Sequence, residues 1–452
     1  MSRHDTPLAA VVMAAGLGTR MRSKLPKHLH ALLGRRLMDW PIEAGRALGP
    51  EPFVVVLSPE TAAAAGTLDG LQTALQAEPR GTGDAVIAAR GAFQDFRGDV
   101  LVLSGDTPLL TAELLRELVA AHRSTAADVT VLSFEPGDPA AYGRVLRDAD
   151  GKLRGIVEAI DATPEELAIR EVNSSIYVFS SDALWSALDR LDPHNAQGEL
   201  YLTDSVRHIV ESGGTGAVHL APDPVQAAGV NTRVELAAAA DALRTRINEG
   251  HMLAGVTIVD PRTTWIEPQV EIAEDVVVHP FTVLAGRSRI EAGAELGPHA
   301  AVVDAVVGPG ATVGPFCYLR PGTVVEAGAK AGTFVEIKNS RIGARTKVPH
   351  LSYIGDADIG EDTNIAAANV TANFSHRPGQ AKGRTTIGRN VRTGVDNTFV
   401  APVEVGDDAW VYPGTVITEN VPPAALAGFP PRQVNKEGYV PREQRVHREH
   451  DD

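Results

Sequence analysis

The sequence predicts an α/β protein with two different halves, and the spacing of its apolar residues leads to this division. In the first half, short apolar runs alternate with helical segments, which is typical of a mostly parallel sheet covered by helices on both faces. In the second half, apolar residues recur at every sixth position, which is typical of hexapeptide repeats that stack into a parallel β-helix. A chain of 452 residues is long enough to hold both domains.

Five apolar runs of the first half are expected to be strands. They occupy residues 8–15, 53–57, 100–103, 129–134 and 175–180. Helices are expected near residues 111–123, 181–191 and 200–212. Ser58 followed by Pro59 is typical of a helix start, because a serine caps the first N–H groups and proline fits the first turn. Ligands of parallel sheets collect at the carboxyl ends of the strands, so the site is expected there.

One helix over residues 232–251 is expected to join the two halves. Thr232 and Glu235 form a capping-box pattern at its start. Apolar residues then follow at helical spacing, namely Leu236, Ala240, Leu243 and Ile247. Gly250 is expected to end the helix. The predicted organisation is a first domain over residues 1–231, the linker helix 232–251, the β-helix 252–436 and a charged, disordered tail 437–452.

The six-residue period persists through most of the second half, with single slips in register. The apolar positions are Ile272, Val278, Leu284, Ile290, Leu296 and Val302, then Val307, Val313, Leu319, Val325, Ala331 and Ile337, then Ile342, Val348, Ile354, Ile359 and Ile365, and finally Ile387, Phe399, Val405, Val411 and Ile417. An amphipathic helix would need a period near 3.6, and a half-buried strand a period of 2. The repeats fail between Asn369 and Thr386, where a polar loop is expected to leave the solenoid.

Charge and composition exclude several classes of function. The net charge of −15 argues against nonspecific binding of nucleic acid or of an anionic membrane surface. No apolar run reaches the length of about 18 residues that spans a bilayer, and the N-terminus has no signal-peptide pattern, so no membrane insertion is expected. The only cysteine, Cys317, excludes an intrachain disulfide and fits a cytoplasmic protein. Cys317 is expected to be a small buried apolar residue rather than a nucleophile.

A glycine loop follows the first apolar run and is a candidate phosphate site. Gly16 and Gly18 would let backbone N–H groups approach phosphate oxygens, and Arg20 and Lys27 would supply positive charge. The same spacing also fits a tight turn between a strand and a helix, with both cations in solvent. Asp106 ends another apolar run, where a carboxylate would meet the ligand crevice, although aspartate is equally common in Asx turns.

The chain resembles the sugar-nucleotide pyrophosphorylases, and among them most closely the bacterial bifunctional UDP-N-acetylglucosamine pyrophosphorylases/glucosamine-1-phosphate acetyltransferases. The resemblance covers nearly the whole chain, with the motifs in the expected order. The first half contributes MAAGLGTRM, LPK, QAEPRGTGDA, SGDTPL, YGR, IVEAIDAT, EVN, NAQGELYLTD and GVN, and the second half contributes LRPG, VEIKNS, PHLSYIGDADIG and APVEVG. The resemblance implies a Rossmann-like nucleotidyltransferase domain followed by a left-handed parallel β-helix.

For the first domain, the resemblance implies a site that transfers UMP from UTP to a sugar phosphate. Residues that would line the pocket for nucleotide and sugar are Met13, Ala14, Ala15, Gly16, Gln76, Gly81, Thr82, Ser104, Gly105, Gly143, Glu158 and Asn173. Arg20 and Lys27 would hold the triphosphate as catalytic cations. Asp106 and Asn231 would bind Mg²⁺, which takes few protein ligands alongside water and phosphate oxygens; without the resemblance, Asn231 reads equally well as part of a helix start.

For the second domain, the resemblance implies acetyl transfer from acetyl-CoA to the amine of glucosamine 1-phosphate. Arg320 and Lys338 would bind the phosphate, His350 would be the general base, and Tyr353 and Asn364 would hold the sugar. From spacing alone, His350 reads as a surface or hydrogen-bonded residue and Lys338 as an exposed charge that blocks edge pairing. Coenzyme A contacts are assigned to Ala367, Asn373, Phe374, Val395 and Pro413, where the sequence departs from the family pattern.

The resemblance therefore predicts two consecutive reactions. Glucosamine 1-phosphate is acetylated with acetyl-CoA, and the resulting N-acetylglucosamine 1-phosphate then reacts with UTP, giving UDP-N-acetylglucosamine, a cell-wall precursor, and pyrophosphate. An alternative is a pyrophosphorylase whose β-helix is a noncatalytic scaffold for oligomerisation or effector binding; the altered coenzyme A region leaves this open. The family is trimeric, so a homotrimer with acetyl sites at subunit contacts is expected.

Overall fold

The computed structural model describes residues 6–16, 18–66, 68, 70–139, 141–374, 379, 381–428 and 433–439. It divides into two compact units, Met1–Arg246 and Ile247–Asp452, which meet inside one helix. Among the described residues, no helix is long and apolar enough to cross a membrane. Most of the expected tail, residues 440–452, lies outside the described part of the chain.

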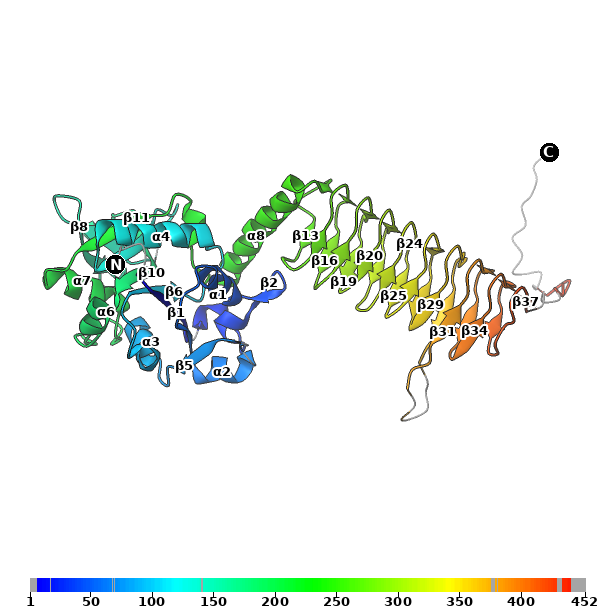
Figure 1. Cartoon of the computed structure of the whole chain (residues 1–452), viewed down its shortest axis with the longest axis horizontal. Coiled ribbons are helices and arrows are strands. Elements are labelled where there is room, and N and C mark those ends of the chain that lie inside the picture. Colours follow the sequence, from blue (N-terminus) through cyan, green and yellow to red (C-terminus); the bar gives the residue numbers. More distant parts are fainter. Residues whose placement is uncertain are drawn as a thin grey trace. The chain divides into compact units, whose positions relative to one another are not determined.

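The first unit is built on one nine-stranded sheet (Figure 1). Its strands are β1 (Leu8–Ala14), β4 (Phe53–Leu57), β5 (Gln72–Leu75), β6 (Asp99–Ser104), β7 (Val129–Phe134), β8 (Arg144–Arg147), β9 (Leu153–Val157), β10 (Val172–Ser180) and β11 (Gly216–Leu220). The main order is β11-β7-β10-β6-β1-β4-β5. β1 pairs in parallel with β4 and β6, as predicted, but β10 runs antiparallel between β6 and β7. The start of β10 therefore lies at the same sheet edge as the ends of β1 and β6.

Helices cover both faces of this sheet. The helices of the unit are α1 (Asp39–Arg46), α2 (Pro59–Ala65), α3 (Thr82–Ala88), α4 (Ala112–Thr125), α5 (Pro164–Leu167), α6 (Ser181–Leu188) and α7 (Leu202–Glu211). One core packs α3, α6 and α7 against residues such as Val11 and Val102. The other packs α1 and α4 against residues such as Val12 and Leu103. Neighbouring residues of one strand enter opposite cores because side chains alternate across a sheet.

Among the residues described for this unit, short 3-10 helices and a small hairpin complete the architecture. They are η2 (Thr19–Met21), η3 (Lys27–Leu29), η4 (Arg90–Phe93) and η5 (Pro224–Ala227), with the hairpin β2 (Ala31–Leu32) and β3 (Arg35–Arg36). The expected start of α2 is confirmed: the Ser58 hydroxyl accepts from the Thr61 N–H at 3.1 Å, and Pro59 occupies the first turn.

Helix α8 (Arg233–Leu253) belongs to both units. Its predicted capping box is confirmed, since the Glu235 N–H donates to the Thr232 hydroxyl at 3.2 Å and the Thr232 N–H donates to the Glu235 carboxylate at 2.7 Å. Leu243 packs in a core of the first unit, whereas Ile247 packs against the core of the second. The expected stop at Gly250 is wrong. The chain turns instead at Gly255, which has a φ of 97° that favours glycine.

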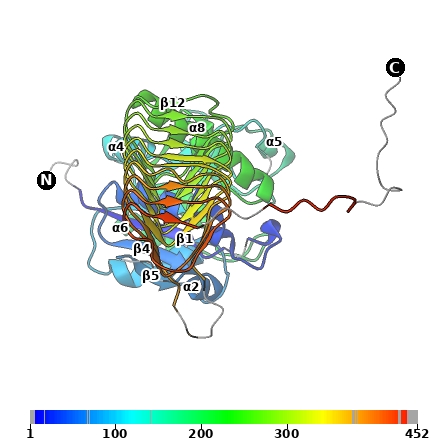
Figure 2. The ribbon, with the colours of Figure 1, turned by 90° about the vertical axis from the view of Figure 1, so that its right-hand side faces the viewer.

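The second unit is a parallel β-helix in which successive coils stack in register (Figures 1 and 2). The six-stranded sheet contains β12 (Thr257–Ile258), β15 (Val277–Val278), β18 (Glu295–Leu296), β21 (Thr312–Val313), β24 (Lys330–Thr333) and β27 (Lys347–His350). The nine-stranded sheet of the β-helix contains β13 (Trp265–Ile266), β16 (Val283–Ala285), β19 (Ala301–Val303), β22 (Tyr318–Leu319), β25 (Glu336–Lys338), β28 (Tyr353–Gly355), β30 (Val370–Ala372), β33 (Thr398–Val400) and β36 (Val416–Ile417).

The remaining strands complete the three faces. The eight-stranded sheet contains β14 (Glu271–Ile272), β17 (Arg289–Ile290), β20 (Val306–Val307), β23 (Val324–Val325), β26 (Arg341–Ile342), β29 (Ala357–Ile359), β31 (Thr385–Ile387) and β34 (Val403–Val405). A three-stranded sheet contains β32 (Arg392–Thr393), β35 (Trp410–Val411) and β37 (Leu426–Ala427). The bridges of Asn364 to Lys347 and to Arg392 connect it to the six-stranded sheet.

The six-residue period marks the side chains that point inward. The repeat residues form one continuous apolar core, and Cys317 lies in it at 2% exposure. Burial raises the pKa of the Cys317 thiol to about 12, so the thiolate is disfavoured. The outward residues of the short strands do not enter this core, so they need not be apolar.

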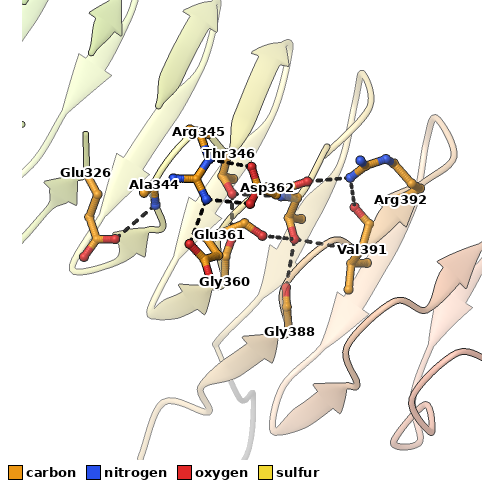
Figure 3. A network of polar contacts seen from close by, with 11 residues as sticks. Glu326, Ala344, Arg345, Thr346, Gly360, Glu361, Asp362, Gly388, Val391 and Arg392 are labelled. Carbon is orange, nitrogen blue, oxygen red and sulfur yellow. Dashed lines mark hydrogen bonds and ion pairs between the residues drawn. The ribbon is translucent and has the colours of Figure 1, made fainter. Parts of the chain in front are cut away.

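Polar residues at the turns tie neighbouring coils together (Figure 3). Arg345 pairs with Glu361 at 2.8 Å and with Asp362 at 2.6 Å, in the next coil. Beneath them, the Thr363 N–H donates to the buried hydroxyl of Thr346 at 3.0 Å. Exposed ion pairs are worth little on their own, so the buried threonine contacts, which satisfy backbone groups, are the larger stabilising feature.

We expect Leu296→Ala to destabilise the β-helix locally. Leu296 is fully buried, and removing its side chain leaves a cavity that costs about 3 kcal/mol. Native-state hydrogen exchange should show faster exchange in β15 and β21, the strands that pair with β18. Thr312→Ala, at an outward position of β21, is the matched control and should change exchange little. Equal effects of the two substitutions would contradict the assignment of Leu296 to the core.

Candidate functional sites

A pocket of about 520 Å³ lies at the edge of the first unit's sheet where β1 and β6 end. It collects most of the site residues expected from the sequence: Met13, Ala15, Gly16, Arg20, Lys27, Gln76, Gly81, Thr82, Ser104, Asp106, Gly143, Glu158, Asn173 and Asn231. Two expected residues are not in its lining. Ala14 is fully buried and its side chain packs in a core, because side chains alternate along β1. Gly105 directly follows β6, and its N–H donates to the Met13 carbonyl at 2.8 Å.

Two cations and two oxygen-bearing side chains meet at one end of this pocket. The Lys27 ammonium pairs with the carboxylate of Asp106. It also donates to the Asn231 amide oxygen at 3.1 Å, and the Arg20 guanidinium donates to the same oxygen at 2.9 Å. The Ser104 hydroxyl donates to the second oxygen of Asp106 at 2.7 Å. Residues from three distant parts of the sequence thus form one polar cluster.

The electrostatics of this cluster keep Asp106 ionised. Burial by itself raises the pKa of Asp106, but the charge of Lys27, the neighbouring His28 and the hydrogen bonds from Lys27 and Ser104 outweigh burial and bring the pKa down to about 2. A carboxylate in this state is an acceptor only, so it can bind a cation at neutral pH.

The donor set of the cluster fits a hard divalent cation. A carboxylate oxygen of Asp106 and the amide oxygen of Asn231 both lie against the Lys27 ammonium. Within the described ranges, no group of three or more His, Cys, Asp or Glu side chains could enclose a metal. A cation held here by Asp106 and Asn231 would need water and phosphate oxygens as its other ligands, which is the usual coordination of Mg²⁺.

Gln76 and the loop before α3 form another wall of the pocket. The Gln76 side-chain nitrogen donates to the Gly81 carbonyl and to the Asp84 carboxylate, both at 2.9 Å. These bonds use both N–H groups and fix the orientation of the amide, which leaves its oxygen as the acceptor. The Thr82 hydroxyl accepts from the Leu202 N–H at 3.0 Å and secures the loop to α7.

Glu158 and Asn173 form the opposite wall. Burial raises the pKa of Glu158, whose carboxylate accepts from the Thr203 hydroxyl at 3.0 Å. The Asn173 side chain donates to the Tyr177 hydroxyl at 2.7 Å and accepts from the Ser175 N–H at 3.1 Å. Asn173 reaches the pocket because β10 runs antiparallel to β6, which brings the start of β10 to the edge where β6 ends.

Several lining residues were not expected from the sequence. Gly18, expected as part of the glycine loop, also lines the pocket, and the unexpected residues are Thr19, His28, Pro79, Ala85, Ala141, Tyr142, Ser174, Ser175, Glu199 and Gly229. Most of them are next to an expected residue in the same motif, so their position beside that residue could have predicted them. The Tyr142 hydroxyl accepts from the Gly229 N–H at 3.2 Å and links two such motifs. His28 carried no signal, because a histidine after LPK reads as an ordinary surface residue.

In the second unit, three expected residues share the nine-stranded sheet of the β-helix. Tyr353 and Lys338 belong to the paired strands β28 and β25, and Arg320 directly follows β22. Arg320 pairs with Glu336 at 2.7 Å, which raises the pKa of the guanidinium. These residues form a polar group on a sheet whose other outward positions are largely apolar.

Lys382 joins this group from the polar loop and was not expected from the sequence. The Lys382 ammonium lies close enough to Lys338 to lower the pKa of Lys338, and the charge of Arg320 acts in the same direction. Like charges this close repel one another, so the arrangement favours binding of an anion between them. The sequence placed Lys382 in a loop without repeats, where periodicity says nothing about its position.

His350 and Asn364 lie on a different sheet. His350 ends β27 of the six-stranded sheet, and Asn364 bridges that sheet to β32. Both residues are exposed, and no hydrogen bond joins either side chain to Arg320, Lys338 or Tyr353 within the described part of the chain. One chain therefore divides the five expected acetyl-site residues between two faces of the solenoid.

The residues assigned to coenzyme A differ strongly in exposure. Asn373 is buried and donates to the carboxylate of Asp356, whereas Phe374 and Val395 are 64% and 49% exposed. The Ala367 carbonyl accepts from the Asp396 N–H at 2.9 Å, and Pro413 packs closely against Gly394. Within the altered loop, residues 375–378 and 380, which include Ser375 and His376, lie outside the described residues.

Comparison with known proteins gives two findings. Residues 10–199 match the family model described as the MobA-like NTP transferase domain. The chain is 48% identical to the Bifunctional protein GlmU of Mycolicibacterium gilvum, over 96% of this chain and 92% of that protein. It is 47% identical to the protein of the same name from Mycobacterium tuberculosis, with the same coverage. The corresponding protein of Corynebacterium aurimucosum is 46% identical, over 96% of this chain and 94% of that protein.

We expect Lys27→Met to destabilise the first unit in a pH-dependent way. The pKa of Asp106 is about 2 in the folded chain and about 3.9 in an unfolded one. Its ionisation therefore stabilises the fold above about pH 4, and this contribution is lost as the pH falls toward 2. Removing Lys27 leaves a buried, unpaired carboxylate, which costs about 3 kcal/mol at neutral pH.

Urea unfolding at neutral pH and at about pH 3 measures this effect. The difference between Lys27→Met and the wild type should shrink at the lower pH, because a protonated Asp106 needs no cation. Lys24→Met, at an exposed position, is the control and should change stability little at either pH. A pH-independent difference would contradict the pairing.

Proposed function

This chain belongs to the family of the bifunctional GlmU proteins, and on that premise we propose that it acetylates glucosamine 1-phosphate with acetyl-CoA and then transfers UMP from UTP to N-acetylglucosamine 1-phosphate. The products are UDP-N-acetylglucosamine and pyrophosphate. The observation that carries the proposal is the pocket at the sheet edge, where Lys27, Arg20, Asp106 and Asn231 meet beside walls suited to a base and a sugar. Relatives that align over 96% of this chain are named as bifunctional proteins.

For uridylyl transfer, the reacting groups are both phosphates. An oxygen of the sugar phosphate attacks the α-phosphorus of UTP, and pyrophosphate leaves. The nucleophile is already an anion, so no general base is needed, and the site acts by positioning and by neutralising charge. Lys27 and Arg20 supply that charge at the phosphate end. A Mg²⁺ ion held by Asp106 and Asn231 would neutralise more of it.

The two walls account for substrate choice. The Gln76 oxygen is a fixed acceptor, because both of its N–H groups are occupied, and an acceptor at this position suits the N3–H of uracil. Glu158, with its raised pKa, and Asn173 border the part of the pocket that would take the sugar. Binding of this sugar would exchange the buried polar contacts of these residues for contacts with its hydroxyl and amide groups.

For acetyl transfer, His350 is the proposed general base. It takes a proton from the glucosamine amine as nitrogen attacks the thioester carbonyl, and coenzyme A leaves as the thiolate. Arg320 and Lys338, joined by Lys382, bind the sugar phosphate, and Tyr353 and Asn364 hold the ring. The coenzyme A contacts remain those proposed from the sequence: Ala367, Asn373, Phe374, Val395 and Pro413.

A homotrimer explains why one chain divides these residues between two faces. The nine-stranded sheet of the β-helix presents exposed apolar residues, including Trp265, Val283 and Val416, whereas Glu295 and Arg289 occupy outward positions on the other sheets. An apolar face of this kind favours contact with another copy. Such contact would place His350 of one copy beside the phosphate group of another. We place this enzyme in the cytoplasm, where its substrates are made and a lone cysteine stays reduced.

A second function is favoured by one observation. Phe374 and Val395 are exposed and replace the family pattern in the donor region, which fits a pyrophosphorylase whose β-helix is only a scaffold. The cationic group around Lys338 argues for the bifunctional enzyme instead, since a scaffold has no need to hold like charges together.

We expect Asp106→Ala and His350→Ala to affect one reaction each. Asp106→Ala should lower Mg²⁺-dependent UDP-sugar formation about 10³-fold, because the phosphate cluster loses its carboxylate. His350→Ala should lower acetyl-CoA-dependent thiol release by about 10²- to 10⁴-fold. Each variant is the control for the other, since each should keep the reaction it does not touch.

The component-omission assay decides between the two functions. Purified protein is incubated with glucosamine 1-phosphate, acetyl-CoA, UTP and Mg²⁺, and each component is left out in turn. Thiol release no greater than that of His350→Ala would refute the acetyl step and support the scaffold. UDP-sugar formation by Asp106→Ala at the wild-type rate would refute the assignment of the first site.

We expect Val283→Glu to break the trimer and with it acetyl transfer. A charge on the apolar face would be buried without a partner in the assembly, which costs several kcal/mol. Light scattering should report smaller particles and the thiol assay a lower rate, while uridylyl transfer persists. Thr312→Glu, on the six-stranded sheet, should leave the assembly intact. Trimers of Val283→Glu would contradict this choice of face.

A further inference from the structure

The pocket of the first unit contains a histidine that has no role in the proposed uridylyl transfer. His28 lies in the lining, directly after Lys27 in η3, and is only 3% exposed. Its Nδ1 atom is inaccessible to solvent and has no hydrogen-bond partner. The Nε2 atom is not among the buried, unpartnered atoms of the described residues. A buried polar atom without a partner costs stability, and an apolar residue would avoid that cost. The position of the ring therefore needs an explanation beyond packing.

The Nε2 edge of the ring faces the glycines at the ends of β1 and β6. A β-carbon at Gly105 would lie 3.1 Å from Cδ2 of His28, and one at Gly16 would lie 3.7 Å from Cε1. Nε2 is the ring atom between these two carbons, so it lies where the glycine loop and the Asp106 loop come together. Glycine at both places leaves the room that the imidazole occupies.

The ring is neutral and its proton can be assigned. Burial lowers the pKa of His28 to about 4, and the charge of Lys27 acts in the same direction. In a neutral imidazole one nitrogen carries the proton and the other a lone pair. A buried lone pair without a partner is tolerated better than a buried N–H group without one. Nδ1 therefore carries the lone pair, and the proton belongs on Nε2. His28 then offers one uncharged N–H donor toward the pocket.

We propose that His28 binds the nucleotide directly, with its Nε2–H donating to a phosphate oxygen of UTP and of the UDP-sugar product. This assignment rests on the proposed uridylyl-transfer function of the pocket and adds a neutral donor to the cations Lys27 and Arg20. A phosphate oxygen is the acceptor that fits, because the ring lies against Gly105 and directly follows Lys27, at the end of the pocket where Lys27 meets Asp106. The unpaired Nδ1 is the cost of holding the ring in this orientation.

Calorimetric titration of three His28 variants with UTP and Mg²⁺, with UDP and with uridine tests the proposal. His28→Leu removes both nitrogens and should weaken UTP and UDP binding about 10- to 100-fold, which is the loss of one hydrogen bond to a charged group. Uridine binding should stay at the wild-type level. His28→Gln carries an N–H near the position of Nε2 and should restore much of the affinity, whereas His28→Asn carries it near Nδ1 and should not.

Thermal unfolding without ligand separates binding from packing. His28→Leu should melt at or above the wild-type temperature, because it removes a sealed polar atom. His30→Leu is the matched control: His30 is also buried with an unpaired nitrogen, but it is outside the pocket lining, so its substitution should leave UTP affinity unchanged. Wild-type affinity of His28→Leu for UTP, or an equal loss for uridine and UTP, would overturn the proposal.

Three further outcomes are decisive. If His28→Leu does not fold, equal UTP affinities of the Gln and Asn variants would overturn the proposal on their own. If the wild type itself neither binds UTP nor forms a UDP-sugar, the proposed function of the pocket fails. If the wild type is active and the His28 variants match it, the function stands and only the role of His28 fails.

Discussion

The buried pair of Lys27 and Asp106 is the contact on which the first pocket depends. Each charge is costly to bury alone, and together they hold η3, the end of β6 and the segment that precedes α8 at one point. Asn231 and Arg20 extend the pair into a larger polar cluster, which is the proposed phosphate site. The stability of this region and its chemistry therefore rest on the same few atoms.

The β-helix follows a different constraint. Its inward positions must be apolar and small enough to stack in one column, which leaves the outward positions free to vary. The proposed second site depends on that freedom, since Lys338 and Tyr353 are outward residues of one sheet and Arg320 directly follows one of its strands. The same freedom permits the exposed apolar residues that favour association. A solenoid can thus change its surface chemistry without changing its core.

Both sites hold polar groups in arrangements that packing alone would not select. Lys338 and Lys382 lie close together despite their repulsion, Glu158 is buried with a raised pKa, and His28 has a sealed nitrogen. Each arrangement costs stability in the free protein, and a ligand of the right charge or hydrogen-bonding pattern would offset that cost. Native proteins concentrate such features where they bind and react.

The sequence by itself determined the two architectures. The alternation of strand-like and helical segments in the first half and the six-residue repeat in the second both reflect local packing. It also placed most of the residues that line the first pocket, through motifs that begin or end strands. Only the tertiary structure decided the rest. The antiparallel course of β10 brings Asn173 to the site, alternation along β1 turns Ala14 into the core, and α8 passes Gly250 to turn at Gly255. The places of Lys382 beside Lys338 and of His28 in the pocket lining had no periodic signal in the sequence. Their positions depend on contacts between segments far apart in the chain, and local spacing carries no information about such contacts.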